Sequence, residues 1–244
     1  MNKFLIKLAD IVIEINSIYD DVLDLCKDYI VKDENPVFSI FTNMDDITFE
    51  RDKSISEAIY EGIPVINYEN GYLETLSVYR KIVNKMLEMD ICLIHGAAIA
   101  LNGEAYLFTA KSGTGKTTHI KLWLNAFKDA YVINGDKPLL MFKDDKVYVC
   151  GTPWSGKENL NRNVIVPLKA ICILQRDETN HIEKISFKEA SNTLIQQIYK
   201  PKDFNDIKTT LGFVSKLGKL VPIYKLGCNM EDEAAIVSYE GMNK

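Results

Sequence analysis

The sequence predicts an α/β fold in which a mixed, partly antiparallel sheet carries a P-loop between a strand and a helix. Residues 110–117 read AKSGTGKT, the glycine-rich phosphate-loop pattern with Ala110 at the first glycine position. The strand-like run EAYLFTA precedes this loop, and the helical run THIKLWLNAF follows it. Asn102-Gly103 joins EAYLFTA to the apolar run ICLIHGAAIAL, and Asn-Gly between apolar runs indicates an antiparallel hairpin.

The composition is that of one large domain or of a domain with an appendage. The chain has 244 residues, of which 47% are hydrophobic, and its 29 Lys and Arg against 34 Asp and Glu give a net charge of −5. This acidic balance, without a Lys/Arg-rich run, disfavours a nucleic-acid partner. No apolar run approaches the roughly 20 residues of a membrane span, so no membrane partner is expected. Five scattered cysteines are typical of reduced thiols, and we therefore expect a cytoplasmic protein.

Residues 1–90 are predicted to form an N-terminal α/β region that packs on the core at its substrate side. Strands are expected at KFLIKL, DIVIEI and NPVFSIFTN, and helices at SIYDDVLDLCKDYIV and over residues 71–89. Arg80 lies in the middle of the apolar face of the last helix. We expect its stem to cross the core and its head to reach water, with an inward anion contact as the alternative.

Residues 91–244 are predicted to form the core that carries the loop. Beyond the loop, strands are expected at AYVIN, KPLLMF, KVYVC, LKAICIL and VPIYKL, and helices over residues 187–199 and 203–218 and at MEDEAAIVSY. LKAICIL is continuously apolar, which is typical of a buried strand. Asn229 is the expected N-cap of the last helix.

The loop residues have the spacing that phosphate binding requires. The glycines of the pattern let consecutive N–H groups turn toward one phosphate, and the start of the next helix adds its dipole. Lys116 supplies a positive charge to the β- and γ-phosphates, and the Thr117 hydroxyl is suited to Mg²⁺. We therefore expect binding of ATP or GTP with Mg²⁺ or Mn²⁺ by these residues: Ser112, Gly113, Thr114, Gly115, Lys116, Thr117 and Thr118.

Two further residues are expected beside the loop. Asp136 follows the strand AYVIN only 20 residues after Lys116, so we expect it on the strand next to the loop, able to reach the metal. In the predicted hairpin the paired residue numbers sum to 205, so Ala100 faces Ala105 and His95 faces Ala110. A histidine on an apolar strand is usually a core residue, but this register places His95 at the start of the loop.

These motifs together resemble the superfamily of phosphoenolpyruvate carboxykinase and HPr kinase/phosphorylase. The resemblance covers residues 91–175 and rests on the His-Gly strand, SGTGKTT, the early Asp136 and Arg162-Asn163 before a buried strand. It implies that Thr117 and Asp136 bind the metal, that His95 is an active-site residue and that Arg162 neutralises charge on the transferred phosphoryl group. It also implies a kinase that phosphorylates a hydroxyl, namely serine in a peptide, in a protein or free.

One position departs from the pattern of the superfamily. Members commonly have two adjacent acids, and HPr kinases use the first as the base for the acceptor hydroxyl, but this position is Gly135. His95 and Glu158 are candidate replacements, and Glu158 lies in a polar loop four residues before Arg162. The alternative is a nucleotide-binding regulatory module with weak or no phosphotransfer. The chain is too short for a carboxykinase, and its sequence leaves the oligomeric state open.

Overall fold

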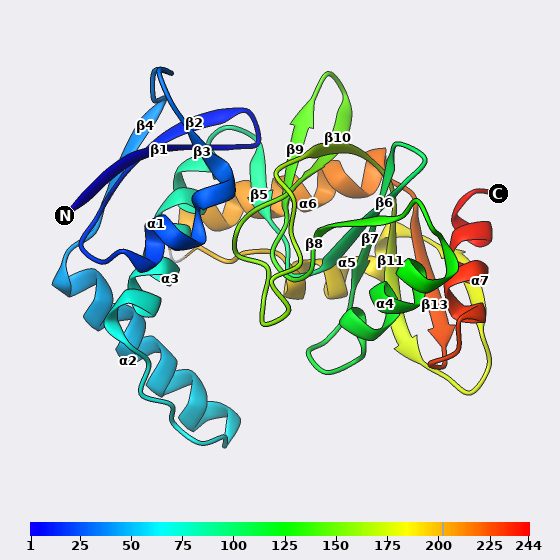
Figure 1. Cartoon of the computed structure of the whole chain (residues 1–244). Coiled ribbons are helices and arrows are strands. Elements are labelled where there is room, and N and C mark those ends of the chain that lie inside the picture. Colours follow the sequence, from blue (N-terminus) through cyan, green and yellow to red (C-terminus); the bar gives the residue numbers. More distant parts are fainter. Residues whose placement is uncertain (202) are drawn as a thin grey trace. The chain divides into compact units, whose positions relative to one another are not determined.

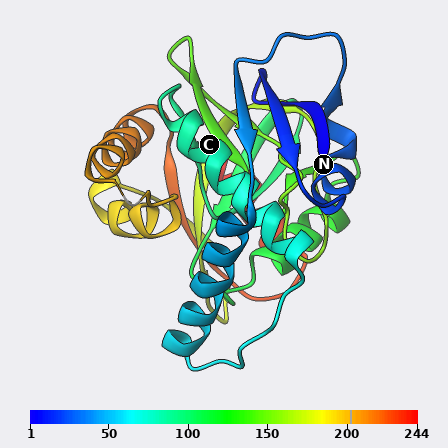
Figure 2. The ribbon, with the colours of Figure 1, turned by 90° about the vertical axis from the view of Figure 1, so that its left-hand side faces the viewer.

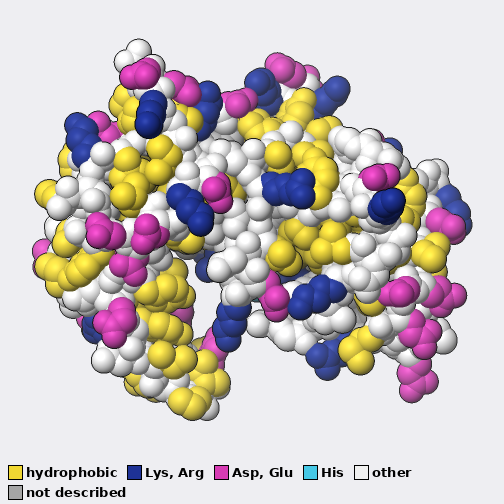
Figure 3. Space-filling model, in the orientation of Figure 1, with side chains coloured by type: hydrophobic (Ala, Val, Ile, Leu, Met, Phe, Trp, Pro, Cys, Tyr) yellow, Lys and Arg dark blue, Asp and Glu magenta, His cyan; other side chains and the backbone are white. Residues whose placement is uncertain are grey.

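The structure is a computed structural model and describes residues 1–201 and 203–244. It is a mixed α/β structure, as predicted, and it divides into two compact units, Met1–Lys85 and Met86–Lys244 (Figure 1). Among the residues described, no helix combines the length and the apolar character needed to cross a membrane. Figure 3 shows positively and negatively charged side chains interspersed over the face that it presents.

The first unit contains a four-stranded sheet in the order β3-β1-β2-β4. Strands β1 and β2 are antiparallel, and β4 runs parallel to β2. The run SIYDDVLDLCKDYIV, which was expected to be one helix, forms a short helix and a 3-10 helix. The 18-residue helix α2 was not predicted. The elements are β1 (Asn2–Leu8), β2 (Ile11–Ser17), α1 (Asp21–Leu25), η1 (Lys27–Tyr29), β3 (Ile30–Val31), β4 (Phe38–Phe41), α2 (Met44–Glu61) and α3 (Asn70–Leu87).

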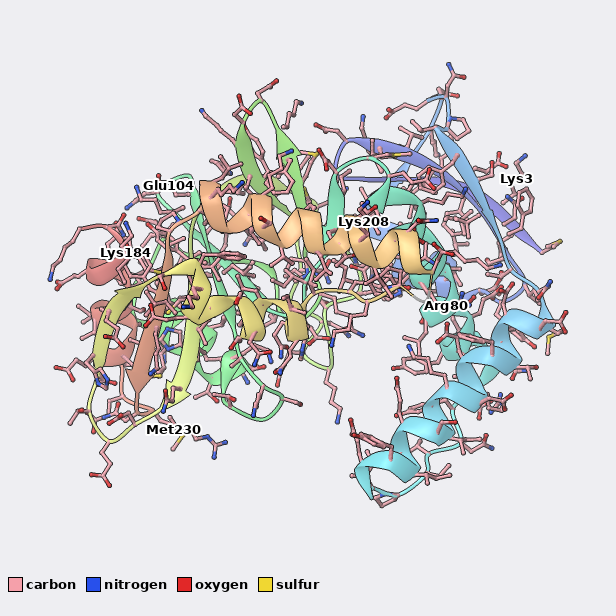
Figure 4. All side chains as sticks on the ribbon, turned by 180° about the vertical axis from the view of Figure 1, so that it is seen from behind. Lys3, Arg80, Glu104, Lys184, Lys208 and Met230 are labelled. Carbon is pink, nitrogen blue, oxygen red and sulfur yellow. The ribbon has the colours of Figure 1, made fainter. Side chains whose placement is uncertain are left out.

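Arg80, labelled in Figure 4, makes the inward anion contact that was the alternative prediction. Its Nε donates a hydrogen bond to the Glu50 carboxylate, which is only 4% exposed. Its guanidinium also lies 3.8 Å from Asp46 and 4.5 Å from the centroid of the Phe49 ring. An apolar helix face accommodates this arginine because a buried carboxylate on α2 neutralises it.

The second unit is built on a nine-stranded mixed sheet. The strand path is β5-β9-β10-β11-β7-β6-β8, and β13 pairs with β11 and β12. The strands are β5 (Ile91–Leu93), β6 (Ala97–Leu101), β7 (Glu104–Thr109), β8 (Tyr131–Asn134), β9 (Leu139–Lys143), β10 (Lys146–Cys150), β11 (Ile165–Arg176), β12 (His181–Ile185) and β13 (Ile223–Cys228). The helices are α4 (Lys116–Ala126), α5 (Phe187–Gln197), α6 (Phe204–Leu220) and α7 (Glu233–Met242).

The predicted hairpin is confirmed, with Ala100 paired to Ala105 in an antiparallel ladder. The two turn residues have positive φ, 54° at Asn102 and 78° at Gly103, as a type I′ turn requires. On its other side β7 pairs with β11 in the parallel direction, so β7 has an antiparallel neighbour and a parallel one. The loop that follows β7 therefore lies at the same sheet edge as the end of β11.

Helices cover both faces of this sheet because side chains alternate along its strands. Ile99 and Phe108 pack on one face with residues of α4 and α7, such as Trp123 and Ala234. Ala98, Leu107 and their neighbours pack on the other face with α5 and α6. Figure 2 shows α5 and α6 together on that face. The predicted cap of α7 is wrong: the helix begins at Glu233, after Asp232, while Asn229 accepts a hydrogen bond from the Glu231 N–H.

Candidate functional site

A glycine-rich loop, residues 110–115, connects β7 to α4. Gly113 has φ of 76° and Gly115 has φ of 123°, and residues other than glycine rarely adopt these backbone angles. Ser112 is exposed in the loop, and Thr118 is exposed on the first turn of α4. The free N–H groups at the start of α4 thus follow directly on a loop whose glycines permit a tight turn.

Arg176, which the sequence analysis did not assign, braces this loop. Its guanidinium donates hydrogen bonds to the carbonyl oxygens of Gly113 (2.5 Å) and Thr114 (3.2 Å). Because C=O and N–H of a trans peptide point in opposite directions, these bonds turn the N–H groups of Thr114 and Gly115 away from the guanidinium. The Thr114 N–H closes a turn onto Lys111 O at 3.3 Å. Arg176 therefore fixes the direction of the loop peptides.

Lys116 lies beneath the loop with only 9% of its surface exposed. Its Nζ donates a hydrogen bond to Ala110 O at 3.3 Å, across the base of the loop. Burial lowers the pKa of Lys116, and the negative charge of Asp136 partly offsets that effect. This ammonium group is thus held where the loop folds back on itself, close enough to Asp136 for the two charges to interact.

Asp136 follows β8 and is positioned by Asn134. The Asn134 side chain is fully buried, and its oxygen accepts the N–H groups of Asp136 (2.9 Å) and Lys137 (2.7 Å). Its amide nitrogen donates to the Thr152 carbonyl oxygen at 2.9 Å. The expectation that this strand lies next to the strand before the loop is wrong, because β6 lies between β7 and β8. Asn134 nevertheless presents Asp136 at the loop edge of the sheet.

His95 lies on the turn between β5 and β6, not opposite Ala110. The ladder of β6 and β7 begins only at Ala97, since β5 pairs instead with β9. The imidazole Nε2 lies 3.1 Å from Asp136 Oδ1, and Nδ1 lies 2.9 Å from Gln197 Oε1. Two further hydrogen bonds fix the backbone of His95: its N–H donates to Gln197 O at 2.7 Å, and its carbonyl oxygen accepts from Thr109 Oγ1 at 2.9 Å.

The His95 contact controls the charge of Asp136. Burial alone would raise the pKa of this carboxyl group, but the hydrogen bond from His95 and the positive charges of Lys137, His95 and Lys116 outweigh it. The pKa of Asp136 consequently lies below its ordinary value. Asp136 is therefore an anion at neutral pH, as a ligand for a hard cation must be.

Thr117 and Asp136 line one cavity of about 370 Å³, together with Gly135, Lys157 and Glu158. Gly156 has φ of 78°, and a Cβ added there would lie 3.1 Å from Asp136 Cβ, so the loop of residues 155–158 approaches Asp136 closely. Glu158 forms an ion pair with Lys121 at 3.4 Å, with both side chains about half exposed. The predicted Thr117, Asp136 and Glu158 are thus brought together.

Arg162 is not brought to this cavity. Its guanidinium carbon lies 4.7 Å from the centroid of the Tyr131 ring, and Tyr131 is the first residue of β8, whereas Asp136 follows the last. A strand rises about 3.3 Å per residue, so β8 separates the two side chains along its length. The arrangement does not support the role predicted for Arg162, which stays a prediction.

Two further cavities flank the loop. The α4–β13 cavity, about 400 Å³, is lined by Thr114, Gly115, Thr118, His119, Leu122, Leu174, Gln175, Arg176, Asp177, Cys228, Asn229 and Met230. The α5 cavity, about 570 Å³, is lined by Ala110, Lys111, Thr114, Ile173, Leu174, Gln175, Arg176, Glu183, Ile185, Glu189, Thr193 and Lys225. Thr114, Leu174, Gln175 and Arg176 line both, so the two cavities adjoin at the loop and at the end of β11.

Comparisons with known proteins do not show a family for this chain. No family model matches the sequence, and no curated protein matches it. Among solved structures, the HPr(Ser) kinase/phosphatase from Coxiella burnetii is similar with a TM-score of 0.39 and 8% sequence identity, over 62% of this chain and 88% of that one. Because a similarity at this level does not assign a function, the function proposed below rests on the residues of the site.

Proposed function

We propose that the chain is an ATP- or GTP-dependent phosphotransferase that moves the γ-phosphate to a hydroxyl, that of serine in a peptide, in a protein or free. The observation that supports this most is the convergence of Lys116 and Thr117, at the start of α4, with the hydrogen-bonded pair His95–Asp136. A glycine-rich loop alone indicates phosphate binding. An ionised carboxylate beside a histidine at the same place adds a metal ligand and an acid–base group.

The donor set suits magnesium that arrives with a nucleotide. Within the described part of the chain, no three or more His, Cys, Asp or Glu side chains are grouped to hold a metal. Thr117 and Asp136 instead offer one hydroxyl and one carboxylate in a shared cavity, and Mg²⁺ in kinases takes few protein ligands because phosphate oxygens supply others. When bound there, Mg²⁺ or Mn²⁺ would neutralise charge on the β- and γ-phosphates.

The remaining roles follow from position. The N–H groups of the loop and the Lys116 ammonium hold the phosphates, and Arg176 keeps the loop peptides oriented. We assign the His95–Asp136 pair as the group that accepts the proton of the acceptor hydroxyl. It takes the place of the carboxylate that members of the superfamily commonly have at the position of Gly135. Glu158 is the weaker candidate because it is half exposed and already paired with Lys121. Phosphoryl transfer demands mainly positioning and charge neutralisation, so one such pair suffices.

The α4–β13 cavity is the best candidate for the base of the nucleotide. It borders the loop and the first turn of α4, and Leu122, Leu174 and Met230 give it apolar walls that a flat ring can contact. Its size is in the range of small-molecule sites. Asn229 and Asp177 add polar groups, and they leave adenine and guanine both open.

The direct test is nucleotide turnover with serine-containing acceptors. Purified protein with Mg-ATP or Mg-GTP is incubated with a serine peptide, a serine-containing protein or free serine, and phosphorylated product is measured by mass spectrometry. K116A should abolish product, whereas K128A, which removes an exposed lysine just beyond α4, should retain it. H95A should lower turnover far more than nucleotide affinity. Equal turnover in the wild-type protein and K116A would refute the proposal.

A second candidate is a nucleotide-binding regulatory module without phosphotransfer. Gly135, where the superfamily pattern has a carboxylate, favours it. A Cβ at Gly135 would lie 3.2 Å from the Ser155 carbonyl oxygen, so the position has little room for an acid. Tight binding of Mg-ATP in a thermal-shift assay, with no product from any acceptor, would select this candidate.

A further inference from the structure

The α5 cavity adjoins the α4–β13 cavity at Thr114 and at the end of β11, and it has a different chemical character. Its walls are the loop residues Ala110, Lys111 and Thr114, the end of β11, the middle of β13, strand β12 and helix α5. Figure 4 views the molecule from behind, where α5 and α6 cover the sheet. At about 570 Å³ the cavity has room for a compound of metabolite size.

Charged groups of both signs line this cavity. Lys111 and Arg176 stand at the loop, and Arg176 is directed to the loop carbonyls. Glu183 lies directly opposite Lys225 in the ladder of β12 and β13. Glu189 lies in the first turn of α5 and accepts hydrogen bonds from the Ser186 N–H and hydroxyl through Oε2, so its contribution to the cavity is that of a carboxylate already bonded to the helix cap. The cavity therefore presents Lys111 and Arg176 on its loop side, and two carboxylates with one cation, Lys225, on the side of β12, β13 and α5, which leaves that side with a net negative charge. A ligand with one group of each sign would satisfy both sides.

One face of α5 connects the cavity to the His95–Asp136 pair. Glu189, Thr193 and Gln197 are spaced four residues apart, so they lie on the same face of the helix. Glu189 and Thr193 line the cavity, and Gln197 holds His95 through its side chain and its carbonyl oxygen. A molecule bound beside Thr193 would thus lie roughly one helical turn from the residue that fixes His95.

We propose that the α5 cavity binds the acceptor, and that the acceptor is a free hydroxy amino acid, whose carboxylate faces Lys111 and Arg176 and whose ammonium group faces Glu183 and Glu189. This inference rests on the phosphotransferase function proposed above. The acceptor hydroxyl oxygen bonds to the γ-phosphorus as the bond between that phosphorus and the β–γ bridging oxygen breaks. Nucleoside diphosphate leaves, and the hydroxyl proton passes to the His95–Asp136 pair.

The first experiment varies the charge of the probe. With saturating Mg-ATP, ADP release is measured with L-serine, L-threonine and L-homoserine, which carry both charges. D-glycerate has only the anion, ethanolamine only the cation, and N-acetylserinamide neither. The amino acids should give the highest kcat/KM, by about tenfold over each single-charge probe, because each of those probes lacks one of the two charged hydrogen-bonding groups. A serine peptide or N-acetylserinamide that exceeds all three amino acids would overturn the inference.

The second experiment blocks the cavity. T193L should raise the KM for the best amino acid by about tenfold, since it fills space and removes a hydroxyl. N192L, on the exposed side of the same helix, is the matched control. E183Q should act like T193L, whereas K184Q, which changes the neighbouring residue on the other face of β12, should not. Equal KM values for T193L and N192L would overturn the inference.

A binding measurement separates this inference from the proposed function. Binding of the three amino acids to the wild-type protein, T193L and N192L is measured by calorimetry without nucleotide. Binding that only T193L abolishes, without turnover, supports the cavity assignment and refutes the phosphotransferase. Turnover of a peptide that T193L leaves unchanged supports the phosphotransferase and refutes the cavity assignment. Absence of binding by all three amino acids also refutes the cavity assignment.

Discussion

Acid should destabilise the unit that carries the site through one buried histidine. His119 lies on α4, three residues after Lys116, and is 2% exposed. Burial lowers its pKa to about 4. Trp123 Nε1 donates toward His119 Nε2 at 3.2 Å, and Ser238 Oγ lies 3.3 Å from the same nitrogen. The shorter hydrogen bond of the indole N–H, 2.8 Å, goes to Ser238 Oγ, and protonation of His119 would place a positive charge on a ring that is buried beside this N–H.

The expected loss of unfolding free energy follows from the pKa values of His119 in the folded and the unfolded chain. In the unfolded chain the ordinary value is about 6.5, so between pH 6.5 and 4 the unfolded state binds more protons than the folded state. Stability is therefore complete above pH 6.5 and is lost as pH falls toward the folded pKa. A single such group costs about 2.5 kcal/mol between pH 7 and pH 4.5.

Tryptophan fluorescence provides the assay. The chain has two tryptophans, Trp123 and Trp154, and both belong to the unit Met86–Lys244. Guanidinium unfolding followed by their emission at pH 7 and pH 4.5 thus reports that unit. In H119Q the fall in unfolding free energy should be smaller by about 2.5 kcal/mol. H181Q, which removes an exposed histidine from β12, is the control and should behave like the wild type. An H119Q variant with the full wild-type fall would refute the reasoning.

Two substitutions test the loop and its neighbour. R176Q should weaken Mg-ATP binding by about tenfold in calorimetry, because two hydrogen bonds to the loop carbonyl oxygens are lost. R162Q is the control and should leave the affinity for Mg-ATP unchanged. Equal weakening by the two substitutions would contradict the conclusion that Arg176 orients the loop peptides. G156A should cost about 1 kcal/mol of unfolding free energy and lower kcat, because its Cβ would press on Asp136. G103A, with the same φ and open space around it, should cost similar stability and keep kcat, and equal kcat in G156A and G103A would exclude the contact with Asp136.

The hairpin, the glycine-rich loop and strand β11 could be predicted because each depends on residues that are close together in the sequence. Asn102-Gly103 set the turn, and with it the pairing of Ala100 with Ala105. The glycine spacing predicted the loop between β7 and α4, where Gly113 and Gly115 have positive φ. Continuous apolar character marked β11 as a buried strand.

The errors concern contacts that depend on strand order. Nothing near Asp136 indicates that β6 separates its strand from β7, because that order is fixed by packing across the whole sheet. The run ending at Leu101 reads as one strand, but it leaves its ladder at His95 to pair β5 with β9. Arg176 could have been inferred: if LKAICIL is parallel to the strand before the loop, its end meets the loop at one sheet edge.

The unequal exposure of the cysteines allows occupancy of the α4–β13 cavity to be measured by thiol modification. Cys26, Cys92, Cys150 and Cys172 are 1% exposed or less, whereas Cys228 is partly exposed and lines the α4–β13 cavity. Burial and the nearby Asp177 raise the pKa of Cys228, so an alkylating reagent would modify it slowly at neutral pH. Reaction at one thiol is countable by intact mass. The unmodified chain could thus report, without a label or a substitution, whether a compound occupies that cavity.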